Sequence, residues 1–113
     1  MAGEKTSTGM DQNVAGLLCY VAWWITGLVF FLIEKENRFV RFHAMQSIVV
    51  GGALMVLGLV LSPVLMVAPL LAVFVWPVFW VLCVVLWIVL MVKAYQNQMY
   101  KLPWAGDFAE KHI

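Results

Sequence analysis

The sequence predicts an all-α integral membrane protein with three transmembrane helices, an amphipathic cytoplasmic elbow and an interfacial C-terminal segment. Two observations lead to this fold class. Of the 113 residues, 65% are hydrophobic and only 12% are charged, which is about half the charged share of a soluble domain. Two long stretches, residues 14–33 and 44–92, also contain no Asp, Glu, Lys or Arg. A soluble chain of this length cannot enclose so many apolar side chains in a core, so its surface must face lipid.

The first uncharged stretch is long enough for one crossing. Residues 14–33 are 20 residues, which make about 30 Å of helix and match the hydrocarbon thickness of a bilayer. The polar N-terminal tail, residues 1–13, shows no cleavable-signal pattern ahead of this stretch. We therefore expect residues 14–33 to form the first span and to remain in the mature protein.

The second uncharged stretch is too long for one crossing. Its 49 residues would make about 74 Å of helix, so the chain has to reverse within it. Pro63 and Pro69, each with the residue before it, supply helix-breaking chemistry near its middle. We expect spans at about residues 44–61 and 70–92. Pro77 leaves two options open, because it lies either in the first turns of the third span or at a kink.

The distribution of Lys and Arg predicts the orientation of these spans. With three spans, the N-terminal tail and the turn between spans two and three share one side, which holds only Lys5. The other side holds Lys35, Arg38, Arg41, Lys93, Lys101 and Lys111. By the positive-inside rule, the elbow and the C-terminal tail, residues 94–113, face the cytoplasm of a prokaryotic plasma membrane, and the N-terminus lies outside. The whole chain, residues 1–113, is expected to form one membrane domain.

The candidate site lies in the elbow and at the start of the second span. If the chain is helical from about Asn37, polar side chains fall on one helix face and small residues continue the same stripe below them. The candidate interaction or pore-mouth patch consists of Arg38, Arg41, His43, Gln46 and Ser47. The expected helix-packing residues are Gly51, Gly58 and Ser62. Their spacing includes small-xxx-small pairs, which let a neighbouring helix approach closely.

Two interpretations of His43 and Gln46 stay open. These side chains can hydrogen-bond neighbouring helices and fix the packing, because polar groups near a membrane need partners. They can instead contact a proton or a substrate, since ionisable residues at membrane depth are often functional. Against the second interpretation, His43 lies at the membrane mouth and has no second ionisable group below it to complete a relay.

The sequence contains no pattern typical of an enzyme or a metal protein. Cys19 and Cys83 lie inside apolar stretches at no metal-ligand spacing, which is typical of small buried hydrophobic residues. No nucleophile has a base beside it at depth, so we expect no catalytic residue, no metal and no cofactor. A net charge of +1 argues against nucleic acid as a partner. The expected partners are the lipid bilayer, further copies of the chain, or other membrane subunits.

Two runs of sequence resemble a known family. They are LIEKENRFVRFHAMQSIV, with its Phe42-His43-Ala44-x-Gln46-Ser47 element, and VLMVKAYQNQMYKLPWAGDFAEK, with Leu102-Pro103-x-x-Gly106-Asp107. From about residue 11 to 111 the chain resembles the small prokaryotic membrane proteins grouped with the chloroplast import component Tic-twenty. The plastid member is a multi-span helical component of a protein-import complex, and it has four spans where this chain predicts three.

The resemblance implies a non-enzymatic membrane component that self-associates or binds partner subunits, as a translocon subunit does. The alternative is a small homo-oligomeric channel or transporter. Three spans enclose no pathway alone, so that alternative requires several copies, and no charged ring lies deep in the membrane to select an ion.

Overall fold

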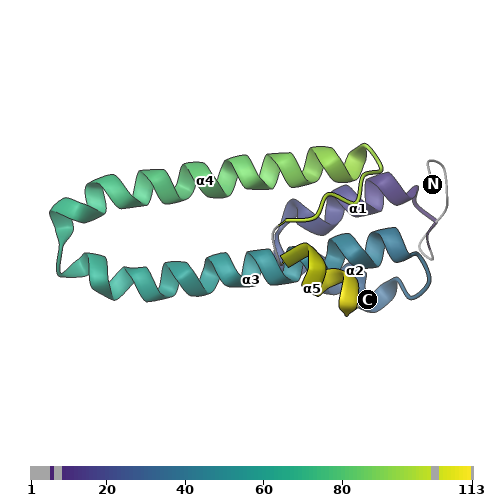
Figure 1. The fold of residues 1–113 in the computed structure, drawn as a ribbon, viewed down its shortest axis with the longest axis horizontal. Helices are drawn as coiled ribbons and strands as arrows, with labels where there is room; N and C mark the ends of the chain where they lie inside the picture. The colour runs from purple at the N-terminus through teal and green to yellow at the C-terminus, as the bar shows by residue number, and fades with distance from the viewer. Residues whose placement is uncertain (1–5, 7–8, 103–104, 113) are drawn as a thin grey trace.

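The structure is a computed structural model that describes residues 6, 9–102 and 105–112 of the chain. Its elements are α1 (Gln12–Val21), α2 (Trp24–Ile33), α3 (Arg38–Met66), α4 (Pro69–Tyr95) and α5 (Ala105–Lys111). Helices α3 and α4 form one long hairpin, and α1, α2 and α5 gather at the end of it where α3 begins (Figure 1). The described residues are therefore all-helical apart from connecting segments, as predicted.

Only α3 and α4, among the described helices, are long and apolar enough to cross a membrane. They contain 29 and 27 residues, or about 40 Å of helix each, which exceeds the roughly 30 Å of hydrocarbon in a bilayer. They correspond to the second and third predicted spans. The first predicted span, residues 14–33, is not confirmed as a transmembrane helix, so the prediction of three such helices is not confirmed either.

The predicted first span is instead a hairpin of two short helices. Helices α1 and α2 have ten residues each, or about 15 Å, which is half the hydrocarbon thickness. The chain reverses between them, and α2 returns beside α1 (Figure 1). Asn37, just after α2, donates from Nδ2 to Oε1 of Gln12 at 3.1 Å. The expectation that the two ends of residues 14–33 lie at opposite ends of a span is therefore wrong.

The reversal occurs at Trp23, which has φ 53° and ψ −130°. A non-glycine residue rarely adopts this conformation, so the surrounding structure has to hold it. Carbonyl groups near a break in a membrane helix need partners. Here the Tyr20 oxygen accepts from the Trp23 N–H at 3.1 Å and the Trp23 oxygen from the Gly27 N–H at 3.0 Å, and side chains add further donors. The donor-to-carbonyl pairs are Thr26 to Cys19 (3.1 Å), Trp87 to Tyr20 (2.6 Å) and Ser47 to Trp23 (2.7 Å).

The long hairpin begins where the sequence predicts and turns within the predicted window. The Asn37 side chain caps α3 by accepting from the Val40 N–H at 3.1 Å. Helix α3 continues past Pro63, so this proline does not end the helix as expected. Pro69 opens α4 at its first position, where the missing N–H costs nothing. Pro77 lies inside α4, more than two turns from its start, which excludes a place in the first turns.

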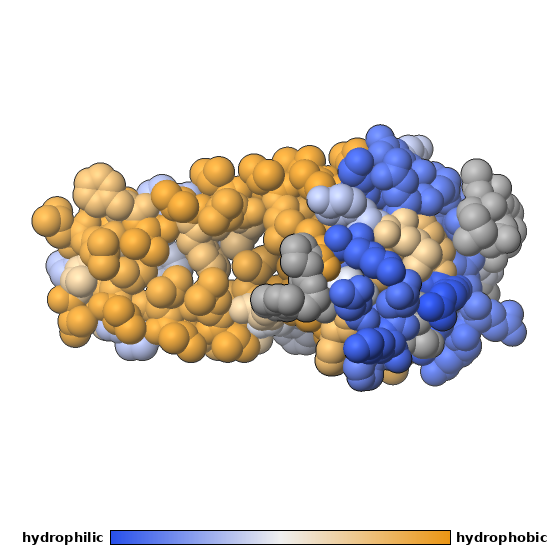
Figure 2. All heavy atoms as spheres, in the orientation of Figure 1, coloured by the Kyte–Doolittle hydropathy of each residue, from blue (hydrophilic) through white to orange (hydrophobic). Residues whose placement is uncertain are grey.

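The molecule has two regions with different surfaces. The head comprises residues 9–51 and 86–112, and the leg comprises residues 52–85. Every described charged residue belongs to the head. Figure 2 shows hydrophilic residues gathered at the head end and hydrophobic residues along the rest of the 50 Å molecule. Two buried clusters, one around Phe39 and one around Leu90, form the head core. The leg therefore depends on lipid to cover it, whereas the head has a core of its own.

Candidate functional site

Three buried polar side chains form a hydrogen-bonded cluster at the centre of the head. The Tyr20 hydroxyl on α1 lies 2.7 Å from Nδ1 of His43 on α3. Nε2 of Gln46, one turn further along α3, donates to the same hydroxyl at 2.9 Å. All three side chains are completely buried. The cluster therefore joins the short hairpin to the first long helix.

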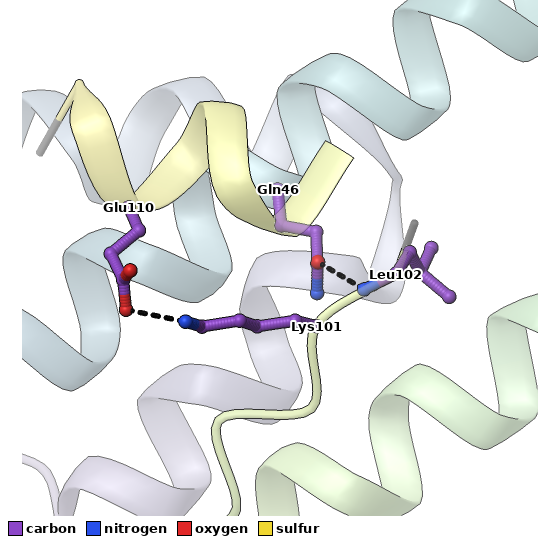
Figure 3. A network of polar contacts seen from close by, with 4 residues as sticks. All are labelled: Gln46, Lys101, Leu102 and Glu110. Carbon is purple, nitrogen blue, oxygen red and sulfur yellow. Dashed lines mark hydrogen bonds and ion pairs between the residues drawn. The ribbon is translucent and has the colours of Figure 1, made fainter. Parts of the chain in front are cut away.

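The same two α3 side chains hold the return segment, residues 96–102, which follows α4 back across the head. His43 Nε2 lies 2.8 Å from the main-chain oxygen of Gln98. Gln46 donates to the Tyr100 oxygen at 2.9 Å. It also accepts from the Leu102 N–H at 3.0 Å (Figure 3). The Gln46 amide thus supplies main-chain partners that an extended segment inside a protein requires.

The network fixes the proton positions on His43. A carbonyl oxygen can only accept, so Nε2, which contacts the Gln98 oxygen, carries the hydrogen. Nδ1 is then the acceptor for the Tyr20 hydroxyl, whose own oxygen accepts from Gln46. Each donor has one acceptor in this arrangement. The cluster is therefore complete when His43 is neutral.

Aromatic rings enclose the remaining surface of His43. The rings of Phe39, Phe42 and Tyr20 meet the imidazole edge to face, with centroids 4.6, 5.2 and 5.4 Å away. The imidazole contacts no solvent in this conformation. This environment supports the interpretation that His43 and Gln46 fix the packing.

Helix α2 lies against α3 at main-chain contact distance. A Cβ added at Gly51 would lie 2.8 Å from the Trp24 nitrogen and 2.9 Å from the Trp23 Cβ. A Cβ added at Gly27 would lie 2.8 Å from the Ala44 oxygen. These distances are too short for a real Cβ, so only glycine permits the approach. The close neighbour of Gly51 is thus another helix of the same chain.

The other two predicted helix-packing residues lie in the leg and are less tightly packed. A Cβ at Gly58 would meet the Phe79 ring at 3.7 Å, which is an ordinary van der Waals distance. The Ser62 hydroxyl donates to the Gly58 oxygen at 2.8 Å, a bond within its own helix. Neither residue brings two backbones into close contact.

The two arginines of the predicted patch have different environments. Nη1 of Arg41 donates to the main-chain oxygens of Phe31 (3.1 Å) and Glu34 (2.7 Å), so the guanidinium caps the C-terminal end of α2. The Glu34 carboxylate is buried and accepts from the Asn37 N–H at 3.0 Å. Arg38 is exposed on the head surface. The structure therefore buries His43, Gln46 and Ser47, uses Arg41 at the elbow and leaves Arg38 facing outward.

Several contacts in the head were not foreseen from the sequence. Gln12 donates from Nε2 to Oδ1 of Asn97 at 3.0 Å and accepts from Asn37, which ties the start of α1 to the elbow and to the end of α4. Asn13 donates to the Tyr95 oxygen at 3.1 Å. A signal for these contacts was present in the sequence, because Gln12, Asn37 and Asn97 are amide residues close to the ends of the uncharged stretches. Three spans would have placed these amides on opposite sides of the membrane, so their pairing was missed.

The C-terminal helix is attached to the head through Lys101 and Gly106. Lys101 Nζ lies 2.8 Å from the Glu110 carboxylate (Figure 3), and this hydrogen bond lowers the pKa of Glu110. The Gly106 N–H donates to the Leu102 oxygen at 2.9 Å. Pro103, part of the C-terminal motif that carried the family resemblance, lies outside the described residues, as does Lys5 of the N-terminal tail.

The cluster uses its polar atoms within the chain. Among the described residues, no buried side-chain nitrogen or oxygen lacks a hydrogen-bond partner. In the same part of the chain, no group of three or more His, Cys, Asp or Glu residues is placed to hold a metal ion. What the arrangement does is hold α1, α3 and the return segment in fixed positions.

Residues 6–109 match the profile of the MamF/MmsF family, described as the magnetosome magnetite crystal formation protein family. A UPF0132 membrane protein of Methanocaldococcus jannaschii is 42% identical over 115 residues, covering 96% of this chain and 94% of that protein. A second protein of that name in the same organism is 39% identical, covering 92% of this chain and 71% of its own length. One from Archaeoglobus fulgidus is 42% identical, covering 92% and 97%.

No solved structure matches the chain. The family found by these matches is a different one from the Tic-twenty group. The family resemblance drawn from the elbow and from the C-terminal run is therefore corrected to MamF/MmsF.

Proposed function

The chain belongs to the MamF/MmsF family of membrane proteins, and on that premise we propose that it is a non-enzymatic structural component of its membrane. In this proposal the leg anchors the protein in the bilayer, and the exposed charged surface of the head binds other proteins or further copies of the chain. The observation that carries the proposal is that exposed charge is confined to the head, at one end of the molecule, while the buried side-chain nitrogens and oxygens of the described residues all have hydrogen-bond partners.

The proposal includes an orientation. The beginning of α1, the elbow and the end of α4 are tied together through Gln12, Asn37 and Asn97, so they share one side of the membrane if α3 and α4 cross it. The described basic residues are all on this side: Lys35, Arg38, Arg41, Lys93, Lys101 and Lys111. The positive-inside rule then places the head, and with it both ends of the chain, at the cytoplasmic surface.

The leg has the surface of an anchor. Its outward-facing residues are large aliphatic and aromatic side chains, such as Leu59, Val60 and Trp80, which are no more attractive to another helix than lipid tails are. Two of the predicted helix-packing residues face the same chain, since Gly51 contacts Trp23 and Gly58 contacts Phe79. Partner binding is therefore proposed for the head.

The family description names the formation of magnetite crystals in magnetosomes. From the family we propose for this chain only a structural role in a membrane, because the hydrogen-bonded head and the apolar leg support that role. The described residues supply no metal-holding group on which to build a mineral-binding role.

The test is native mass spectrometry of the protein extracted from its own membrane in nanodiscs. We expect the chain in a complex of fixed ratio that dissociates when Lys35 and Arg38, which are both exposed, are changed to Glu. The matched control is Leu59→Phe in the leg, where the side chain is 65% exposed; this variant should keep the complex.

Three results would contradict the proposal. A bare monomer of the wild-type chain would remove the partner. If the complex is lost in Leu59→Phe and kept in the Lys35 and Arg38 variant, the interface lies in the leg and not in the head. A homo-oligomer that conducts ions in liposomes would favour the channel alternative.

A further inference from the structure

The two halves of the molecule differ in width. Helices α1 and α2 pack beside α3 and α4 in the head, whereas only α3 and α4 continue through the leg (Figure 1). A helix with its side chains is about 10–12 Å across, so each occupies roughly 80–110 Å² in cross-section. Four helices therefore give the head about twice the cross-section of the leg.

The additional helices of the head have a surface suited to lipid. The exposed residues of the α1–α2 hairpin between Val21 and Ile33 are apolar. Six of them are large residues, five in α2 and one at the end of α1, and each is 41–56% exposed. They are Val21, Ile25, Leu28, Val29, Leu32 and Ile33. Such a continuous apolar surface is unfavourable in water, so the hairpin inserts beside α3 and α4.

The hairpin enters only one leaflet. Its helices are about 15 Å long, so its tip at Trp23 reaches the middle of a hydrocarbon core of about 30 Å. Its other end is polar, because Gln12 and Asn37 lie there. The far leaflet contains only the ends of α3 and α4 and their apolar turn, where Val67 is 84% exposed.

We propose that the chain is a membrane wedge that prefers curved bilayers with the head leaflet on the convex side. A body that is wide in one leaflet and narrow in the other strains a flat bilayer, because it spreads the lipids of one leaflet only. Bending the bilayer toward the wide side relieves that strain. Partial insertion of amphipathic elements makes membrane binding sensitive to curvature for the same reason.

The wedge keeps its shape because the hairpin is clamped. Ser47 holds the Trp23 oxygen at 2.7 Å, and Gly51 and Gly27 allow α2 to touch the α3 backbone. The Tyr20, His43 and Gln46 cluster fixes α1 from the other side. The curvature preference is a property of one copy, so it is independent of the partner binding proposed above.

The first experiment measures sorting of the full chain among single phospholipid vesicles of different sizes at low protein density. Lys111→Cys is labelled with a maleimide dye before reconstitution, and a membrane-impermeant quencher then distinguishes heads on the outer leaflet from heads on the inner one; the natural Cys19 is buried and Cys83 lies in the leg. Molecules with the head on the outer leaflet should become several-fold denser, relative to lipid, as vesicle diameter falls. Molecules with the head on the inner, concave leaflet should show the opposite trend. Equal density at all diameters in both orientations would overturn the proposal.

The second experiment tests the depth on which the wedge depends, using spin labels on single cysteines in a chain whose natural Cys19 and Cys83 are replaced by alanine. Ile25→Cys at the hairpin tip and Met66→Cys at the end of the leg are both well exposed, so the label disturbs no core. We expect the Ile25 label at the bilayer centre and the Met66 label near the far surface. A third label, Asp11→Cys, is exposed at the start of α1 and should lie at the head surface. An Asp11 label at the far surface, level with Met66, would show that the stretch crosses the bilayer, and the wedge would be refuted whatever the head binds.

Discussion

The head and the leg are stabilised by different partners. In the head, side chains far apart in the sequence hydrogen-bond one another, as Tyr20, His43 and Gln46 do. In the described residues of the leg, the side-chain hydrogen bond runs from Ser62 to the main-chain oxygen of Gly58, four residues earlier in the same helix. The head thus owes its shape to its own chain, whereas the leg owes its stability to a solvent, the bilayer, that covers its apolar surface. Substitutions of the same kind should therefore have unequal effects in the two regions.

The largest effect is expected in the central cluster. Gln46→Ala removes two donated bonds and one accepted bond and leaves the Tyr100 oxygen and the Leu102 N–H without partners. A buried unpaired group costs about 1–3 kcal/mol, so we expect the free energy of unfolding to fall by about 3 kcal/mol or more. Denaturant titration in detergent, followed by circular dichroism, measures this.

The matched control for Gln46 is Gln98→Ala. His43 contacts the main-chain oxygen of Gln98, and the Gln98 side chain is on the exposed surface, so this variant should unfold like the wild type. Equal losses in the two variants would mean that the cluster does not hold the return segment.

Two adjacent glycines at the border of head and leg give the next contrast. Gly51→Ala places a Cβ 2.8 Å from the Trp24 nitrogen, and such overpacking costs about 1–3 kcal/mol. Gly52→Ala meets nothing within 4 Å and should be stabilising by about 0.5–1 kcal/mol, because glycine weakens a helix interior. Thermal unfolding of the two variants side by side decides the point. A larger loss at Gly52 would contradict the packing of α2 on α3.

The two serines on α3 compare the regions directly. Ser47→Ala removes the bond to the strained Trp23 and should lower the free energy of unfolding by about 1 kcal/mol. Ser62→Ala removes only a bond within its own helix and should be close to neutral. Hydrogen exchange at residues 22–26 should also rise in Ser47→Ala and stay unchanged in Ser62→Ala. If the two variants behave alike, the hydrogen bond from Ser47 does not hold the chain at Trp23.

The smallest effect concerns the surface of the head. Lys101 holds the pKa of Glu110 below its ordinary value, so the stabilisation from this pair is present at neutral pH. The stabilisation begins to fall once the pH drops below the ordinary carboxyl pKa, and it is lost when the pH passes below the lowered pKa and Glu110 becomes protonated in the folded state. The pair is well exposed, so its contribution is small and falls with salt. An NMR titration should show the Glu110 pKa rising in Lys101→Ala, and an unchanged pKa would show that another group causes the shift.

The leg was more predictable from the sequence than the head. Its uncharged length demands a reversal, and the turn lies where the prolines indicated, although α3 continues past Pro63. The break at Trp23 had no such signal, since neither glycine nor proline lies there. The carbonyl groups around it accept from Thr26 nearby and from Ser47 and Trp87, which lie far along the chain. A stretch of the right length for one span was therefore taken for a span.

Only the α3 side of the candidate site was predictable from the sequence. The face carrying His43, Gln46 and Ser47 follows from helical spacing within α3. Its partner Tyr20 lies in α1, its partner Trp23 lies at the break between α1 and α2, and the return segment lies beyond α4. Those pairings require that the first uncharged stretch folds back, which its composition does not reveal.

The re-entrant α1–α2 hairpin is tested most directly by labelling single cysteines in sealed, oriented membrane vesicles with an impermeant reagent. The positions are Lys35→Cys in the elbow, Gln96→Cys after α4, both exposed, and a cysteine added before Met1. The hairpin predicts that all three react from the same side of the membrane. Reaction of the N-terminal cysteine from the side opposite to Lys35→Cys would restore a third span and contradict the fold.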